Sequence, residues 1–231
     1  MNFQAFFALS VVAVSGVVFA APAASVPAHD GLVPVESRQL DQLRLRPDAD
    51  LGGYRRIMID PVQVEFRDGW LKNINYYTRN PSRWLGKDDA RRIAEDAAAG
   101  LRDSVAEAFK ARGYEIVGAP ESGVLRLTPS ATDLDVYAPD RLSPWRTRTF
   151  TRDAGQATLL LEARDAVSGT LLGRVVHRGR AQQMGRLERA TDVSNRFWFD
   201  ALFGRWAANC VAAFEASGSR PGRSAEPATG R

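Results

Sequence analysis

The stretch ATLLLEARDAVSGTLLGRVVHR, residues 157–178, decides the fold. On both sides of Asp165–Thr170, side chains that suit a core alternate with side chains that suit solvent. A period of two predicts two β-strands. The residues between them end in a late glycine, which fits a hairpin loop of about four to five residues. An antiparallel hairpin is therefore the expected centre of a sheet.

Further strands and two helices surround this hairpin. Alternation predicts strands over residues 54–66, 114–117 and 124–136. Pro61 cannot donate a ladder hydrogen bond, so it suggests an edge or a bulge in the first of these strands. The helices are expected over 88–112 and 192–216. In the first of them an apolar stripe recurs every four residues, at Ile93, Ala97, Leu101, Val105 and Phe109.

These elements predict an α+β fold in the order β-α-β-β-β-β-α. We expect a two-layer sandwich, in which two amphipathic helices cover one face of a mostly antiparallel sheet of about four to five strands. The chain has 231 residues, of which 45% are apolar, and this supports one folded domain rather than two. That domain is expected over residues 51–216, after an extended lead-in at 21–50 and before a disordered tail at 217–231.

The N-terminus has the composition of a signal peptide. Residues 3–20 carry no charge, and small residues follow, so cleavage is expected after Ala20 or alternatively after Ala23. Retention of the segment as an anchor is the alternative. No cysteine follows the apolar run, so lipidation there is not expected. We therefore predict a periplasmic or secreted protein.

Two long connections carry aromatic and basic residues together. Residues 66–86 and 138–155 are expected as loops, and loops of this length are often functional. Arginine beside tryptophan or tyrosine can bind phosphates or lipid headgroups. The candidate binding residues are Trp70, Tyr76, Tyr77, Trp84, Arg141, Trp145, Arg146, Arg148 and Arg152.

Catalytic constellations are hard to assemble from this sequence. No Gly-x-Ser-x-Gly turn occurs, and His177 sits in the middle of a predicted strand. The single cysteine, Cys210, falls on the apolar stripe of the last helix and is expected to be structural, as are Asp60 and Pro61. Asp133 and Asp135 would share one strand face. This pair is the only specific support for a carboxylate hydrolase, and no cofactor or metal site is predicted.

The chain also resembles a known family. The matching pieces are Leu45–Asp48, Ile59–Val62, Tyr114–Val117, Gly123–Leu127 with Ala131–Leu134, the turn at Asp165–Gly169, and the terminal helix with Phe197 and Trp206. In their order and spacing they resemble a bacterial envelope family, domain of unknown function family 3313, many of whose members are lipoproteins. The resemblance covers about residues 40–216. It implies an α/β envelope domain and no catalytic residues.

Charge and composition complete the functional expectation. The net charge is +4, and 28 of the 31 basic residues are arginines. We expect a non-enzymatic binding or accessory domain of the envelope, acting through its basic aromatic loops. Its partner would be an envelope protein or an anionic surface such as lipopolysaccharide or phospholipid, and not nucleic acid. The alternatives are a secreted hydrolase using paired carboxylates and a structural subunit of an envelope complex.

Overall fold

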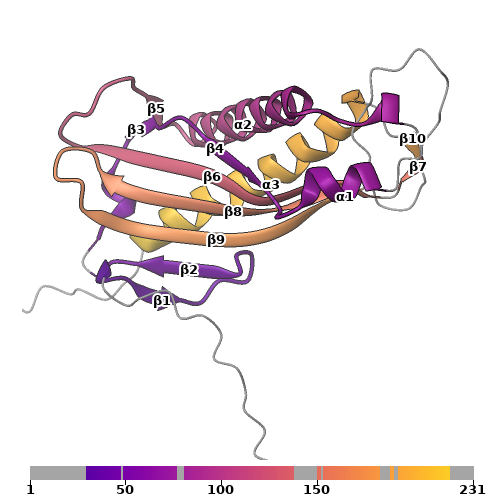
Figure 1. Cartoon of the computed structure of the whole chain (residues 1–231). Coiled ribbons are helices and arrows are strands. Elements are labelled where there is room, and N and C mark those ends of the chain that lie inside the picture. The colour runs from indigo at the N-terminus through magenta and orange to yellow at the C-terminus, as the bar shows by residue number, and fades with distance from the viewer. Residues whose placement is uncertain are drawn as a thin grey trace, which may run out of the picture.

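The structure is a computed structural model that describes residues 30–47, 49–76, 81–137, 150–151, 153–182, 188–189 and 192–218. Figure 1 shows a curved sheet with long helices behind it. The strands are β1 (Val33–Val35), β2 (Gln42–Leu45), β3 (Arg56–Ile59), β4 (Gln63–Phe66), β5 (Glu115–Ile116), β6 (Val124–Val136), β7 (Phe150–Thr151), β8 (Asp153–Asp165), β9 (Leu171–Gln182) and β10 (Glu188–Arg189). The helices are α1 (Trp70–Tyr76), α2 (Lys87–Lys110) and α3 (Asp192–Gly218), with short 3-10 turns η2 (Leu51–Gly53) and η3 (Pro81–Arg83).

The predicted hairpin is the centre of the sheet. β8 and β9 pair antiparallel along almost their whole length, with Glu162 opposite Arg174. Leu159 and Leu161 are buried on the inner face, while Glu162 points to the outer face. The Asp165 carboxylate closes the turn by accepting hydrogen bonds from the backbone N–H groups of Val167 and Ser168.

The α+β class is confirmed, but the predicted strand number and order are wrong. The main sheet has eight strands in the order β1-β2-β9-β8-β6-β3-β5, with β4 paired to β6, and β7 and β10 form a separate two-stranded sheet. β1 and β2 lie within residues 21–50, for which the sequence predicts an extended lead-in, so the folded domain begins before residue 51. Short strands like these carry too little alternation to be recognised in a sequence.

The sheet is also mixed, whereas the sequence predicts a mostly antiparallel one. The strands on the side of β6 away from β8 pair in parallel. β3 and β4 both run parallel to β6, and β5 runs parallel to β3. The reason is the α2 crossover, because a strand that follows a crossover helix returns in the same direction. The predicted strand at 54–66 is in fact two strands, interrupted at Asp60–Pro61.

The long helices pack together on one face of the sheet (Figure 1). α2 buries Leu101, Val105 and Phe109, which belong to the stripe predicted from the sequence. α3 contributes Phe203, Trp206 and other fully buried side chains to the same core. The opposite face of the sheet carries alternating polar side chains, as expected for a sheet with one covered face.

Close contact between α3 and β9 depends on a residue without a side chain. A Cβ atom at Gly179 would lie 2.5 Å from the Leu202 side chain and 2.9 Å from Trp206 Nε1. We therefore expect Gly179→Ala to lower the free energy of unfolding by about 1–3 kcal/mol, as overpacking does elsewhere. Denaturant titration measures this change.

Gly204 in α3 provides the matched control, because a Cβ there would meet nothing within 4 Å. Gly204→Ala should raise the free energy of unfolding by up to about 1 kcal/mol, the helix preference for alanine over glycine. Equal effects of the two substitutions would contradict this account of the α3–β9 contact.

Candidate binding surface

The first predicted loop, residues 66–86, is largely helical. α1 and η3 occupy most of its described part. Trp70 begins α1, stacks on Phe66 with ring centroids 4.2 Å apart, and donates a hydrogen bond from Nε1 to the Val136 carbonyl. Its side chain is buried. The assignment of Trp70 to a binding loop is therefore corrected, because its ring anchors α1 to β6 and does not face solvent.

The other two described aromatic candidates are exposed. Tyr76 is 80% exposed at the end of α1, and Trp84 is 55% exposed just after η3. Asn75 holds the two segments together, since its side chain donates to the Leu85 carbonyl at 3.0 Å and accepts from the Leu85 N–H at 2.9 Å. Tyr76 and Trp84 are therefore presented from one braced unit.

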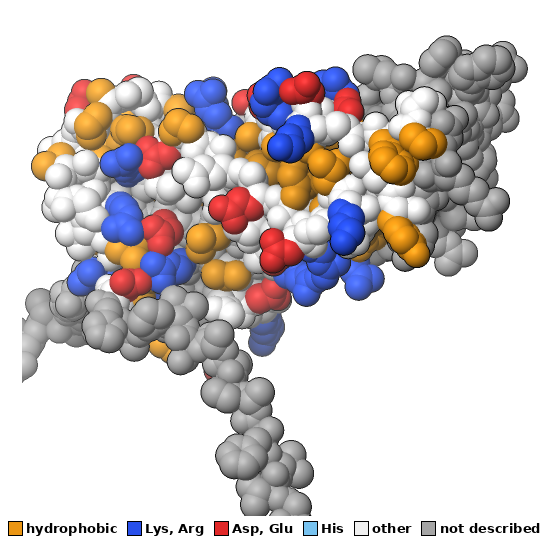
Figure 2. Space-filling view, viewed as in Figure 1, with side chains coloured by type: hydrophobic (Ala, Val, Ile, Leu, Met, Phe, Trp, Pro, Cys, Tyr) orange, Lys and Arg blue, Asp and Glu red, His pale blue; other side chains and the backbone are white. Residues whose placement is uncertain are grey.

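Two further exposed aromatic residues lie at the same end of the molecule. Tyr137 directly follows β6, and Phe197 lies in the first turns of α3, where it packs edge-on against Trp198. Figure 1 places α1, η3 and the start of α3 together at this end. We call the four side chains of Tyr76, Trp84, Tyr137 and Phe197 the aromatic end. Figure 2 shows hydrophobic side chains gathered on the surface around α1.

The sequence did not single out Tyr137 and Phe197 as binding residues, although the signal was partly present. Tyr137 adjoins the predicted second loop. The spacing of Phe197, Trp206 and Cys210 along the last helix predicts that Phe197 lies on its buried face. That helix assignment is wrong for Phe197, which is 60% exposed. In Figure 1 the first turns of α3 lie at the end of the molecule that also carries α1.

Six predicted binding residues lie outside the described part of the chain: Tyr77, Arg141, Trp145, Arg146, Arg148 and Arg152. The segment carrying residues 141–148 leaves the described fold after Tyr137 and re-enters it at β7. β7 pairs with β10, close before α3 in the chain, and Figure 1 places this pair beside the aromatic end.

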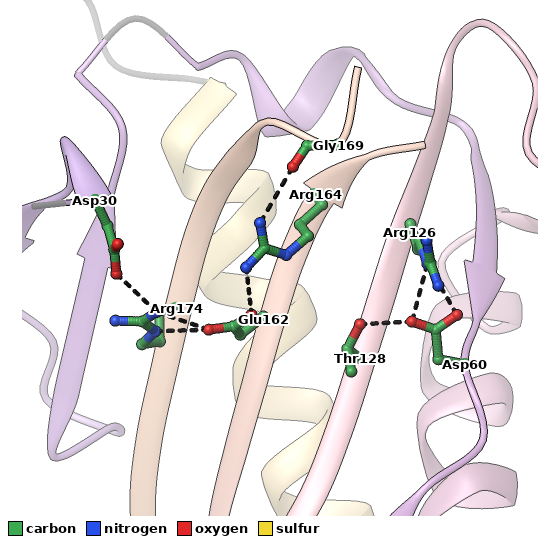
Figure 3. Close-up of polar contacts among 8 residues, drawn as sticks. All are labelled: Asp30, Asp60, Arg126, Thr128, Glu162, Arg164, Gly169 and Arg174. Carbon is green, nitrogen blue, oxygen red and sulfur yellow. Dashed lines mark hydrogen bonds and ion pairs between the residues drawn. The ribbon is translucent and has the colours of Figure 1, made fainter. Parts of the chain in front are cut away.

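The outer face of the sheet carries two clusters of polar side chains (Figure 3). In the first, the buried carboxylate of Asp60 accepts two hydrogen bonds of 2.9 Å from Arg126 Nε and one of 2.6 Å from Thr128 Oγ1. Asp60 and the adjoining Pro61 thus occupy the break between β3 and β4. The hydrogen bonds of Asp60 attach this break to β6.

In the second cluster, Glu162 lies between two arginines (Figure 3). Its carboxylate is 2.8 Å from Arg164 Nη2 and 2.7 Å from Arg174 Nη2, and Arg174 also reaches Asp30 at 2.8 Å. Burial by itself would raise the pKa of Glu162, but the hydrogen bonds from Arg164 and Arg174 outweigh it and lower that pKa. These ion pairs connect β8, β9 and the segment before β1.

Cys210 and His177, the two residues weighed as catalytic candidates, both face the interior of the fold. Burial raises the pKa of the Cys210 thiol to about 12, so Cys210 carries no thiolate at neutral pH. His177 faces α3, and its ring lies edge-on to Trp206 with centroids 6.0 Å apart. His177 therefore belongs to the packing between β9 and α3, and Cys210 belongs to the buried core.

The acidic pair at the end of β6 is interrupted by a bulge. Asp133 has a φ of 51°, and the register between β6 and β8 shifts there. Asp135 is engaged by Arg67 at 2.9 Å. Across the described residues, no group of three or more His, Cys, Asp or Glu side chains is placed to hold a metal ion.

A protein-family model decides the relationship. The model described as protein of unknown function DUF3313 matches residues 23–210. The chain belongs to this DUF3313 family. This match confirms the resemblance drawn from the sequence. Among curated proteins, none matches this chain.

Solved structures show more distant likeness. A PelC dodecamer from Paraburkholderia phytofirmans is 12% identical, with 72% of this chain and 95% of that chain covered and a TM-score of 0.38. Protein XCC0632 from Xanthomonas campestris is 11% identical, with 71% and 85% covered and a TM-score of 0.36. A neuraminyllactose-binding hemagglutinin homolog from Helicobacter pylori is 11% identical, with 81% and 96% covered and a TM-score of 0.32. At these TM-scores the likeness carries no conclusion about ligand or assembly.

The Glu162 cluster generates a pH-dependent prediction. Because the pKa of Glu162 is lowered by folding, its ionised form stabilises the folded state above the ordinary value of 4.5, and this contribution is lost as pH falls through the folded-state pKa. Glu162→Gln should therefore lower the free energy of unfolding at pH 7. The difference from the unsubstituted protein should shrink in denaturant titrations below pH 4.5.

Asp133→Asn is the control for that experiment, because Asp133 is exposed on the same sheet and forms no salt bridge within the described residues. It should change stability by no more than about 0.5 kcal/mol at either pH. A loss at Glu162→Gln that persists unchanged at low pH would contradict the ionic role.

Proposed function

We propose that this DUF3313 protein is an exported binding domain of the bacterial envelope that contacts an anionic lipid surface through its aromatic end. The observation that carries the proposal is that four exposed aromatic residues, Tyr76, Trp84, Tyr137 and Phe197, belong to elements that lie at one end of the fold. Tyrosine and tryptophan combine an apolar body with a polar tip, which suits the boundary between lipid chains and headgroups.

Basic residues supply the second part of the proposal. Residues 66–86 contain four basic side chains and one acidic side chain, and residues 138–152 have the same balance. Arginine pairs with phosphate through two parallel hydrogen bonds and keeps its charge at every physiological pH. The aromatic side chains would enter the boundary between lipid chains and headgroups. The arginines of residues 66–86 and 138–152 would bind the phosphates of lipopolysaccharide or phospholipid.

Export is the proposed setting for this interaction. The uncharged run at residues 3–20, followed by small residues, supports it. Among the described residues, no helix is both long enough and apolar enough to cross a membrane. The contact with lipid that we propose is made by exposed aromatic side chains and by charge.

Vesicle co-sedimentation tests the binding proposal. Protein purified from bacterial cells should sediment with vesicles of phosphatidylglycerol and phosphatidylethanolamine at low salt, and less so at high salt because ions screen the attraction. The double variant Tyr76→Ala/Trp84→Ala should bind these vesicles about tenfold more weakly, since it removes two interfacial side chains. Vesicles of phosphatidylcholine show how much of the binding needs anionic lipid.

The chain offers a matched double control in Val33→Ala/Val167→Ala. Val33 and Val167 are also exposed apolar residues, 44% and 67% respectively, and they lie away from the aromatic end. This variant should bind vesicles like the unsubstituted protein. Equal binding by both double variants, or no sedimentation at low salt, would refute the proposal.

Intact-mass spectrometry of the protein from the cell envelope tests export separately. The expected N-terminus is Ala21, or Ala24 if cleavage follows Ala23. A mass that includes Met1 would instead show that the apolar segment is retained.

A further inference from the structure

A cavity of about 490 Å³ lies at the opposite end of the molecule from the aromatic end. Its walls are the ends of β3 and β5 and one face of α2. The cavity exists because the sheet is cut short there: β3 ends at Ile59, the chain does not resume a strand until Gln63, and β5 is only two residues long. We call it the β3–α2 recess.

The lining of the β3–α2 recess combines apolar and charged side chains. A volume of this size falls in the range of small-molecule sites, which is about 300–1,000 Å³. Four residues of α2 line one wall, Arg102, Asp103, Ala106 and Lys110, and the ends of β3 and β5 with the residues after them line the other. The apolar lining residues are Met58, Ile59, Pro61, Ala106, Ile116 and Val117.

Two cations lie along the α2 wall of the recess. Arg102 and Lys110 are eight residues apart, which is about 12 Å along a helix. Neither forms a salt bridge within the described residues, although Arg91, Arg92 and Arg112 in and beside the same helix all do. The recess therefore contains positive charge that the described fold leaves without an ionic partner.

The two carboxylates in the lining do not cancel this charge. Asp60 is occupied by Arg126 and Thr128, which lie on the outer face of the sheet and not among the lining residues. Only Asp103 remains, against the two cations Arg102 and Lys110. The balance at the recess is therefore positive.

We propose that the β3–α2 recess binds a small amphiphilic anion, a short acyl or alkyl chain that ends in a carboxylate or a phosphate. The chain would lie against the apolar ends of β3 and β5, where burial of hydrocarbon is favourable. The head would pair with Arg102 or Lys110 in a charge-assisted hydrogen bond. This site is independent of the aromatic end, because the two lie at opposite ends of the fold.

Isothermal titration of the whole protein with octanoate and with octyl phosphate tests the proposal and distinguishes the two headgroups. Saturable binding of either anion at one site per chain is expected. Octanol, which keeps the chain without the charge, and inorganic phosphate, which keeps a charge without the chain, should each bind at least tenfold more weakly. Equally tight binding of octanol or of inorganic phosphate would overturn the amphiphilic assignment.

Two variants locate the binding. Arg102→Gln/Lys110→Gln should weaken octanoate at least tenfold by removing the head's partners, and Ala106→Phe should abolish binding by filling the recess. Their matched controls are Arg205→Gln, an exposed arginine on α3, and Ala99→Phe, an exposed alanine of α2 outside the recess; both should leave affinity unchanged.

The variants also separate this proposal from the lipid-surface proposal. Thermal melting confirms that each variant is folded before its affinity is compared. Tyr76→Ala/Trp84→Ala should bind octanoate as the unsubstituted protein does, whatever its behaviour toward vesicles. Octanoate binding that survives both recess variants, or that is absent from the unsubstituted protein, would overturn the inference.

Discussion

The buried carboxylate of Asp60 holds together the place where the sheet changes character. β6 is long enough to pair with two separate strands along one edge, β3 first and then β4. Asp60 lies between them, and Arg126 and Thr128 of β6 hold its side chain. The Asp60 N–H also donates to the Leu127 carbonyl, so both the backbone and the side chain tie the break to β6. Removing a hydrogen-bonded charge from such a position is costly, because its partners are left unpaired.

Both ends of the molecule follow from this break. Upstream, β3 ends at Ile59 between β6 and the short edge strand β5, and the β3–α2 recess lies beside this end. Downstream, β4 leads into α1, which Trp70 anchors by its hydrogen bond to the Val136 carbonyl. α1 in turn presents Tyr76, and through Asn75 it braces the segment that carries Trp84. The proposed lipid contact and the proposed ligand site lie at opposite ends of the sheet, and both depend on the break between β3 and β4.

The candidate surface could be predicted only in part. Aromatic residues near basic residues in 66–86 and 138–155 are visible in the sequence, and Tyr76 and Trp84 are exposed. Trp70 lies in the same aromatic and basic stretch of sequence as Tyr76 and Trp84. Its ring is nevertheless buried, because it stacks on Phe66 and donates a hydrogen bond to β6. The sequence does not predict the recess, since its walls bring residues 58–61 together with residues 102–118, about forty positions further along the chain. The sequence predicts a structural role for Asp60 and Pro61, but nothing in it places them near Arg102 and Lys110.

By itself the sequence determined the β8–β9 hairpin, the two long helices and the family. Alternation over 157–178 and the four-residue stripe of α2 are local patterns, so each predicts its own element without knowledge of neighbours. Only the tertiary structure decided that β3, β4 and β5 pair parallel, that β1 and β2 join the sheet, and which aromatic side chains reach solvent. These outcomes depend on which distant strand offers free hydrogen-bonding groups and which helix covers the apolar face, and short segments carry no local record of either.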